Sequence, residues 1–196
     1  VRFSPDESVL EKCQEAGAEF AQNLKKIKKQ RIPRQGLTEA QIDRTEQAVG
    51  RIVGSLCVLT AHQQGKHQGF LTSWISQATF SPPGLMIAIS KDWEEVIGLE
   101  SGSFFVLNLL KEGRNIRRYF SFQKDQEKDP FAEVETTTAA NGCLILAEAL
   151  AYLECTVQRR LDAGDCWLIY ATVEEGNVLE AQGKTAIWHR KSGRQY

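Results

Sequence analysis

The spacing of hydrophobic residues changes near Gly50 from a helical period to an extended one. Before that position, apolar residues recur every three or four places over residues 4–29, which predicts one long amphipathic helix. Residues 30–37 have the composition of a linker. A second helix is expected over residues 38–49. The first helix must bury its apolar face against another part of a protein. Because a linker follows this helix, we expect it to belong to an upstream domain and not to pack on the domain that comes after the linker.

After Gly50, runs of β-branched and aliphatic residues alternate with turn residues, which predicts about six to eight strands and a few short helices. The expected strands cover residues 55–62, 67–72, 85–90, 104–110, 144–146, 151–161, 167–174 and 185–189. Short helices are expected over residues 93–100 and 115–122, and a polar surface loop over residues 123–135. Strands at regular spacing with tight turns favour a barrel over a doubly wound parallel sheet.

The composition is that of an ordinary globular protein, which excludes the collagen-like, disordered and mucin-like classes. Of the 196 residues, 42% are hydrophobic and 25% are charged, and the formal net charge is −1. No apolar run reaches the roughly 18–20 residues that span a bilayer, and the first residues lack the apolar region of a signal peptide. We therefore expect a cytoplasmic protein with no membrane span and no nucleic-acid partner.

The charge is unevenly distributed at one place, a run of Lys and Arg without an intervening acid over residues 25–34. We interpret this run as a solvated helix end whose cations complement the helix dipole. A phosphate or membrane contact is the alternative. The chain also lacks an initiating Met, so we expect it to be a fragment of a longer protein.

The cysteines and histidines form no pattern that points to a metal or to disulfide bonds. There are five cysteines and three histidines, without CxxC, HxxxH or HExxH spacing. An odd number of widely spaced cysteines favours reduced thiols. We therefore expect no metal in this chain, and we interpret the thiols of Cys57 and Cys166 as structural.

The segment over residues 69–83 is unusually polar for a stretch between two buried strands. It opens with Gly69, closes with Pro82 and Pro83, and carries several Ser, Thr and Gln side chains between them. Hydroxyls and backbone N–H groups hold a phosphate or a polar ring without a full charge, and Trp74 offers a cover for a flat aromatic ligand. The alternative is a Ser/Thr-rich edge strand with a buried Trp.

This segment resembles the signature of the flavin reductase-like FMN-binding family, in which a glycine, small polar residues and a double proline precede a buried strand. Four later blocks resemble the same family in the same order. They are residues 85–92, residues 104–110 (FFVLNLL, which resembles the family's F-x-V-N-x-L strand), the Gly164-Asp165 turn, and the tail over 189–196. The resemblance covers roughly residues 47–196.

The resemblance implies a mainly β protein with short helices, namely a flavin reductase-like FMN-binding split β-barrel, which follows the N-terminal amphipathic helix here. It also implies a homodimer with flavin near the subunit interface. Six residues form the implied cofactor-binding set: Ser73, Trp74, Ser76, Gln77, Ser90 and Lys91. The resemblance implies that Ser73 and Trp74 lie along the isoalloxazine through backbone contacts. It implies that Ser76 and Gln77 face the ribityl chain and phosphate, and that Ser90 and Lys91 contact the phosphate end. No catalytic acid or base is assigned, because hydride transfer needs stacked rings and exclusion of water.

Two features depart from the family pattern. Cys166 stands where many members have His, near the nicotinamide face. Asp92, Glu94 and Glu95 follow Lys91 in place of the usual Ser and Thr phosphate ligands, and carboxylates close to a phosphate repel it. We therefore expect the isolated domain to bind FMN weakly.

Residues 1–31 resemble the last helix of a flavodoxin-like domain, as found in flavodiiron proteins. In cyanobacteria and other oxygenic phototrophs these proteins carry a C-terminal flavin reductase-like domain. We therefore expect residues 1–35 to be the terminal helix and linker of the flavodoxin-like domain, and residues 36–196 to be the split-barrel domain. The resemblance implies that the parent passes electrons from NAD(P)H, through FMN or FAD, toward reduction of O2 to water. The implied partner is a second copy or a paralogue.

Two alternatives remain open. One is a stand-alone flavin reductase that supplies reduced FMN, and the helix over residues 4–29 argues against it. The other is a flavin-depleted split barrel that acts as a dimerisation module. The acidic stretch after Lys91 and the Cys166 substitution favour this second alternative.

Overall fold

The computed structural model describes residues 39–63, 65–93, 98–113, 116–120 and 129–191, together with five positions between Lys12 and Ala18. These five positions are helical, as predicted. The rest of the predicted helix, the linker and the basic run lie outside the described residues. The chain divides into two units, Val1–Thr45 and Glu46–Tyr196. Helix α2 (Glu39–Val49) confirms the second predicted helix.

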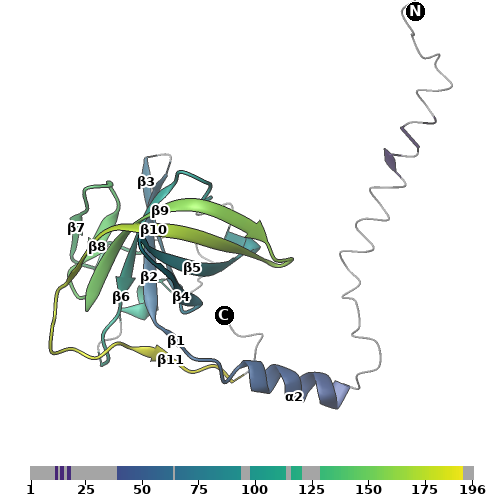
Figure 1. The fold of residues 1–196 in the computed structure, drawn as a ribbon, viewed down its shortest axis with the longest axis horizontal. Coiled ribbons are helices and arrows are strands. Elements are labelled where there is room, and N and C mark those ends of the chain that lie inside the picture. The colour runs from purple at the N-terminus through teal and green to yellow at the C-terminus, as the bar shows by residue number, and fades with distance from the viewer. Residues whose placement is uncertain are drawn as a thin grey trace, which may run out of the picture. The chain divides into compact units, whose positions relative to one another are not determined.

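Among the described residues, seven strands form one antiparallel sheet in the order β3-β2-β6-β9-β10-β5-β4. Their bounds are β2 Cys57–Gln63, β3 Lys66–Thr72, β4 Ile75–Phe80, β5 Pro83–Ser90, β6 Phe104–Leu109, β9 Ala151–Asp162 and β10 Cys166–Val178. The two edge strands, β3 and β4, are joined by Ser73 and Trp74 alone. Such a link spans at most ~11 Å between Cα atoms. The sheet therefore curls until its edges meet, which confirms the predicted barrel (Figure 1).

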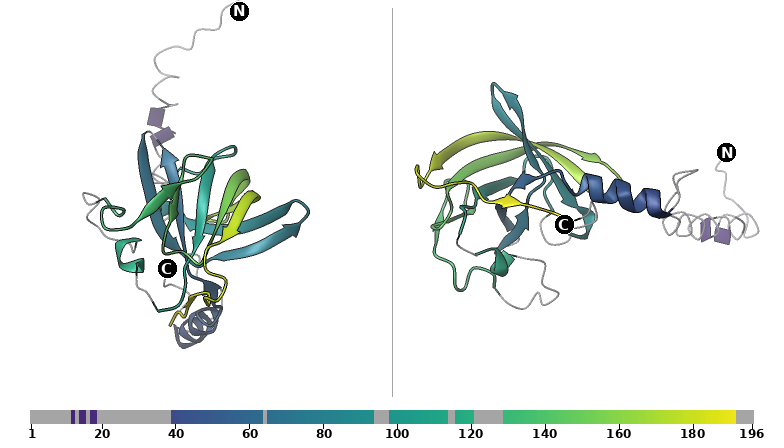
Figure 2. Two further views of the ribbon diagram at one scale, coloured as in Figure 1. Left: turned by 90° about the vertical axis from the view of Figure 1, so that its left-hand side faces the viewer. Right: turned by 90° about the horizontal axis from the view of Figure 1, so that it is seen from below.

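The long hairpin of β9 and β10 carries much of the curvature. Its ladder changes register between Tyr170 and Ala171 and again between Val173 and Glu175. An extra residue on one strand bends that strand and increases its twist. Figures 1 and 2 show this hairpin, in green and yellow, bending across the other strands.

Two short ribbons and two short helices flank the sheet in the described part of the chain. Their bounds are β1 Gly54–Ser55 with β11 Ile187–Trp188, β7 Thr136–Thr138 with β8 Leu144–Leu146, the 3-10 helix η1 Lys91–Trp93, and α4 Arg117–Phe120. The β1–β11 ribbon confirms the short strand predicted near residue 187, and α4 confirms the short helix predicted near residue 118. No helix of the described residues is both long and apolar enough to cross a bilayer.

The core fills the barrel interior from alternate positions of each strand. On β5, Leu85, Ile87 and Ile89 are buried, while Met86 between them is 38% exposed. Strand β2 is buried on both faces: Leu59 joins the barrel core, and Val58 joins a second cluster outside the sheet. Burial on both faces explains why residues 57–61 of this strand show no alternation of buried and exposed positions.

Asn108 of the F-x-V-N-x-L strand is a buried structural residue. Its side chain is fully enclosed. Its Oδ1 accepts the backbone N–H of Leu146 at 2.8 Å, and its Nδ2 donates to the carbonyl of Leu144 at 3.3 Å and to that of Val58 at 3.4 Å. One amide thus connects β6 to both β8 and β2, which do not pair with each other. The motif residue supports the fold, since buried polar groups need partners.

The predictions were wrong for two kinds of short element. The helix predicted over residues 93–100 is not helical at residues 98–100, where Gly98 adopts φ 40°. Strand β4 was not among the expected strands, because four of its six residues are exposed and it lacks the apolar alternation of a half-buried strand. Its place at the sheet edge agrees with the edge strand that was the alternative interpretation of residues 69–83. Strand β7 was missed because it consists of three threonines and has no apolar residue that could mark a buried face.

Candidate functional site

The six predicted cofactor-binding residues lie around β5 and the strand beside it. They occupy three places in the fold: the β3–β4 crossing (Ser73, Trp74), β4 (Ser76, Gln77), and the β5–η1 junction (Ser90, Lys91). The crossing is fixed to β5 by a hydrogen bond from the Ala88 N–H to the carbonyl of Trp74, 2.9 Å long. Segments predicted separately from the sequence are therefore neighbours in the fold.

The β4–β5 register separates two of these places. Ser76 pairs with Met86, and Ser90 lies four residues further along β5. At ~3.3 Å per residue this amounts to about 13 Å. The crossing at Trp74 lies between the two. One phosphate group therefore cannot contact both the Ser76 position and the Ser90 position, and the two phosphate contacts implied by resemblance are alternatives.

A partly apolar surface runs across β5 and β10 on the side opposite the barrel core. We call it the outer face, and its members alternate with core residues along each strand. Cross-strand pairs place Cys166 beside Ser90, Leu168 beside Ala88, and Tyr170 beside Met86. Leu161, which pairs with Leu168 from β9, is 64% exposed. The outer face thus combines exposed apolar side chains with the hydroxyl of Ser90 at its edge.

The β5–η1 junction is rich in carboxylates. The Lys91 Nζ forms an ion pair with Asp162 Oδ1 at 2.6 Å. The same carboxylate accepts the Gly164 N–H at 2.8 Å, and the Lys91 N–H donates to the Asp165 carbonyl at 3.0 Å. The Gly164-Asp165 turn of the family pattern is therefore adjacent to Lys91, whose charge is already matched by Asp162.

Ser90 and Trp167 complete this junction. The Ser90 hydroxyl donates to Asp92 Oδ2 and accepts the Asp92 N–H, both at 3.3 Å. The Trp167 ring has the Lys91 ammonium 4.5 Å from its centroid and the Arg160 guanidinium 4.1 Å from it. Of the three acids expected to repel a phosphate, Asp92 is therefore at the junction, while Glu94 and Glu95 lie outside the described residues.

The thiols near the site are held protonated. Burial, followed by the Asp165 carboxylate, raises the pKa of Cys166 to about 11. Burial alone raises the pKa of Cys57 to about 12. Since the thiolate is the reactive form, neither thiol is a nucleophile at neutral pH.

We predict that Cys166 and Cys57 resist alkylation in the folded protein at pH 7.5. With a pKa of about 11, roughly one Cys166 in three thousand is a thiolate at pH 7.5, and the alkylation rate should rise steadily with pH up to that pKa. Iodoacetamide treatment followed by peptide mass spectrometry measures each site separately. Protein unfolded in urea is the control, and equal rates for Cys166 in both samples would contradict the prediction.

Two glycines near the crossing have different roles: Gly69 makes room for core rings, and Gly54 lets β1 approach the crossing closely. A Cβ on Gly69 would lie 2.8 Å from Phe131 Cζ and 2.9 Å from Phe120 Cε1, so this glycine makes room for two core rings. A Cβ on Gly54 would lie 1.8 Å from the carbonyl oxygen of Ser73. Gly54, which the sequence analysis did not single out, therefore sets how closely β1 approaches the crossing.

Arg190 is a second residue that the sequence analysis left out of the site. It is 7% exposed, and its guanidinium lies 5.1 Å from the centroid of the Trp74 ring. The tail over residues 189–196 was part of the family resemblance, so the signal was present, but no local pattern connects this position to Trp74. The contact is visible only once the β1–β11 ribbon is in place.

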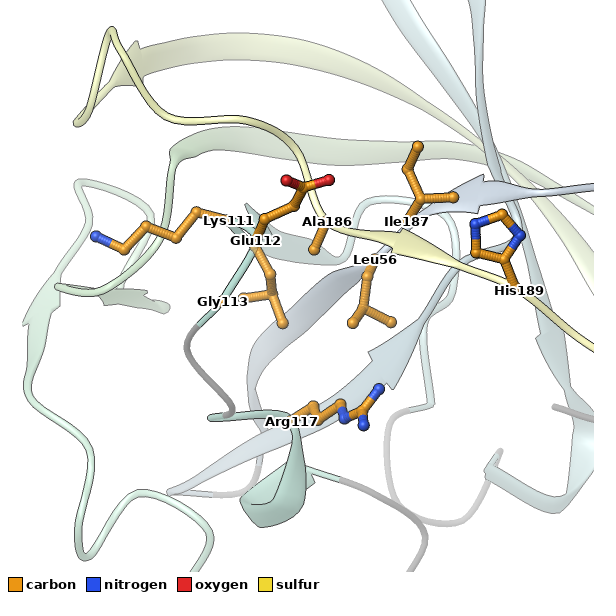
Figure 3. A pocket seen from close by; sticks show the side chains of 9 residues that line it. Leu56, Lys111, Glu112, Gly113, Arg117, Ala186, Ile187 and His189 are labelled. Atoms are coloured by element: carbon orange, nitrogen blue, oxygen red, sulfur yellow. The ribbon is translucent and has the colours of Figure 1, made fainter.

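A cavity of about 380 Å³ opens beside the β1–β11 ribbon. Its lining includes Leu56, Leu110, Ala186, Arg117 and His189. Figure 3 shows the side chains of Arg117, which belongs to α4, and of His189, which directly follows β11, at this cavity. None of the six predicted cofactor-binding residues lines it. Within the described residues, no group of three His, Cys, Asp or Glu side chains is arranged to hold a metal ion.

Comparison with known families and proteins gives a consistent result. Residues 49–196 match the family described as flavin reductase like domain. A Nostoc protein named "Putative diflavin flavoprotein A 4" is 61% identical over 193 residues, which are 98% of this chain and 34% of that protein. A Synechocystis protein of the same name is 53% identical over 199 residues, 100% of this chain and 33% of that protein. The chain therefore spans about a third of the length of these relatives.

The fold is also found in solved structures. The NADH:FAD oxidoreductase SgcE6 of Streptomyces globisporus superposes with a TM-score of 0.68 at 20% identity, over 83% of this chain and 96% of that one. Flavin reductase HpaC, solved with NADP+, superposes with a TM-score of 0.65 at 19% identity, over 80% and 96% of the two chains. These similarities establish a shared fold.

Proposed function

The chain belongs to the flavin reductase-like family, and we propose that it binds FMN against the outer face and the β3–β4 crossing, where NAD(P)H transfers a hydride to the flavin. The observation that carries the proposal is the β5–β10 register. It puts Ser90 beside Cys166, next to the Gly164-Asp165 turn, with Trp74 on the adjoining crossing. Three blocks that resemble the family in sequence therefore meet at one surface.

The side chains of this surface fit a flavin. Met86 and Leu161 expose apolar area on which a flat ring can lie. Ser73 and Ser76 offer hydroxyls on the crossing and on β4, which suit a polyhydroxyl chain. Arg190 lies at the crossing, while Lys91 and Arg160 lie over the Trp167 ring at the start of β10, and cations in these places suit an anionic phosphate. The bound flavin supplies the hydride-accepting ring, and that ring is common to FMN and FAD.

The protein residues bind and orient in this proposal and transfer no proton. The crossing presents backbone groups of Ser73 and Trp74 beside the outer face, while Leu168 and Tyr170 exclude water from it. Cys166 occupies the position near the nicotinamide. It keeps its proton at neutral pH, so it serves as a small neutral contact in place of the His of other members.

We further propose that a second copy or a paralogue covers the outer face. Met86 is 38% exposed and Leu161 64% exposed, and apolar side chains gathered on one face are typical of an interaction surface. A partner there would bury the flavin between two barrels. The protein would then work as a homodimer, or as a heterodimer in its parent.

The parent protein is proposed to be a cytoplasmic flavodiiron protein that passes electrons from NAD(P)H toward reduction of O2 to water. The support is the family match together with relatives about three times as long as this chain. In this proposal residues 1–35 belong to a flavodoxin-like domain, residues 36–196 form the flavin reductase-like domain, and iron is bound elsewhere in the parent.

Fluorescence titration with FMN, followed by anaerobic addition of NADH or NADPH, tests the proposal. We expect saturable quenching and then loss of the visible flavin absorbance. Replacing Ser76 and Gln77 with Ala should weaken FMN binding by ~1 kcal/mol for each lost hydrogen bond, or roughly fivefold in Kd. The matched control replaces Ser101 and Gln158, an exposed Ser and Gln pair outside the proposed site, whose side chains donate to the Gln158 carbonyl and to Thr172.

The outcome also separates the alternatives. A chain that forms a dimer but never quenches FMN would be a dimerisation module. One that releases the flavin as soon as it is reduced would be a supplier of reduced FMN. Equal FMN affinity for the Ser76/Gln77 variant and its control would show that the flavin lies elsewhere.

A further inference from the structure

Arg190 differs from Lys91 and Arg160, the cations at the β5–η1 junction, because it is buried without an acid. It is 7% exposed, and its guanidinium donates one hydrogen bond, 3.2 Å long, to the carbonyl of Ile52. The ion pairs among the described residues do not include it, whereas Lys91 pairs with Asp162 and Arg160 lies 3.6 Å from Glu100. A guanidinium has five N–H donors in a fixed plane, so most of those of Arg190 lack an acceptor.

The surroundings hold this guanidinium in one place. The Trp74 ring lies 5.1 Å from it on one side, and the Ile52 carbonyl anchors one of its nitrogens. Trp74 is in turn tied to β5 through Ala88, and Gly54 brings β1 against the carbonyl of Ser73. A cation fixed by an aromatic ring and a backbone carbonyl is preorganised for an anion, since no rotamer freedom is lost on binding.

The charge balance at the two ends of the site is unequal. At the β5–η1 junction, Asp162 neutralises Lys91 and Asp92 holds the Ser90 hydroxyl. A phosphate there would displace or face these carboxylates. At the crossing, the buried guanidinium of Arg190 has no carboxylate to displace. The Arg190 nitrogens without a protein partner are not fully enclosed, so an anion can reach them and form charge-assisted hydrogen bonds.

We propose that Arg190 is the anion-binding residue of this site and that it takes a phosphate group of a nucleotide cofactor, in the role that the family resemblance gives to Lys91. The proposal rests on the proposed function, because it assigns one ligand contact within the same site. Two sources share this chemistry, the 5′-phosphate of FMN and the phosphates of the nicotinamide dinucleotide. The experiment distinguishes them.

The test compares FMN with riboflavin, which lacks the phosphate, in the wild type and in three variants. Kd values come from fluorescence quenching, which needs no turnover. We expect Arg190→Gln to weaken FMN about tenfold or more, as for loss of a charge-assisted hydrogen bond, and to leave riboflavin unchanged. Arg190→Lys should retain part of the preference for FMN. Lys91→Gln tests the competing assignment from the resemblance, and it should reduce the preference for FMN less than Arg190→Gln does.

If Arg190→Gln leaves both flavins unchanged but raises the Kd of NADPH or NADH, measured by the same quenching method, the phosphate is that of the dinucleotide. Equal weakening of FMN and riboflavin would overturn the proposal, as would loss of the FMN preference in Lys91→Gln but not in Arg190→Gln. Should Arg190→Gln fail to fold, a competition titration of the wild-type protein with inorganic phosphate replaces it. Inorganic phosphate should then weaken the binding of FMN, or of the dinucleotide, and leave the binding of riboflavin unchanged. A wild type that binds neither flavin would refute the proposed function itself.

Discussion

Replacing Asn108 with Leu should destabilise the barrel by about 2–4 kcal/mol, although the two side chains are nearly equal in volume. The buried Leu146 N–H would lose its acceptor, 2.8 Å away, and the carbonyl of Val58 would lose a donor. A buried N–H without a partner costs about 1–3 kcal/mol. The carbonyl of Leu144 keeps the Thr60 hydroxyl, 2.5 Å away, which limits the loss.

Urea unfolding followed by circular dichroism measures this difference. Asn177→Leu is the control, because Asn177 is an exposed residue of β10 and its replacement should change stability by less than ~0.5 kcal/mol. If both variants unfolded at the same urea concentration, the amide network around Asn108 would contribute nothing to stability.

Replacing Gly54 with Ala should weaken FMN binding more than tenfold and also lower stability. The new methyl would lie 1.8 Å from the Ser73 carbonyl oxygen, so β1 and the crossing must separate. Overpacking of this kind costs about 1–3 kcal/mol. Because the displaced atoms belong to the crossing itself, the loss in flavin affinity should exceed what general destabilisation explains.

Gly65→Ala is the comparison for this second prediction. Gly65 lies in the turn between β2 and β3 with φ 76°, and nothing lies near its added Cβ. It therefore tests the backbone strain of a glycine replacement without a clash, at a distance from the crossing. Thermal melting and FMN titration of both variants give the two quantities. Unchanged FMN affinity in Gly54→Ala would place the flavin away from Ser73.

The sequence predicted best those strands that are buried on both faces or that alternate cleanly. Leu85, Ile87 and Ile89 form a recognisable run because their burial is a property of one strand. Strand β4 has no such signal, since it is an exposed edge whose partner β5 supplies the register. Closure of the barrel was predicted from strand spacing and from the family resemblance, and the two-residue crossing shows how it is achieved.

The sequence predicted which segments form the candidate site, but it did not predict which partners its charged side chains have. The resemblance located the crossing and the β5–η1 junction. The ion pair of Lys91 joins residues 71 positions apart, and the contact of Arg190 with Ile52 joins residues 138 positions apart. No local pattern encodes such pairs. Gly69 was assigned to a ligand segment for the same reason, because the rings that it accommodates come from a distant part of the chain.

The β1–β11 ribbon has a consequence for how such a barrel can be combined with other domains. Gly54 pairs with Trp188, so the strand that enters the barrel and the strand that leaves it lie side by side. A domain whose entry and exit adjoin can be appended to another polypeptide, or inserted into one, without redirecting its strands. Fusion then requires only a connecting segment of suitable length. The architecture is thus modular at the point where α2 leads into β1, which is compatible with relatives in which this region makes up about a third of the chain.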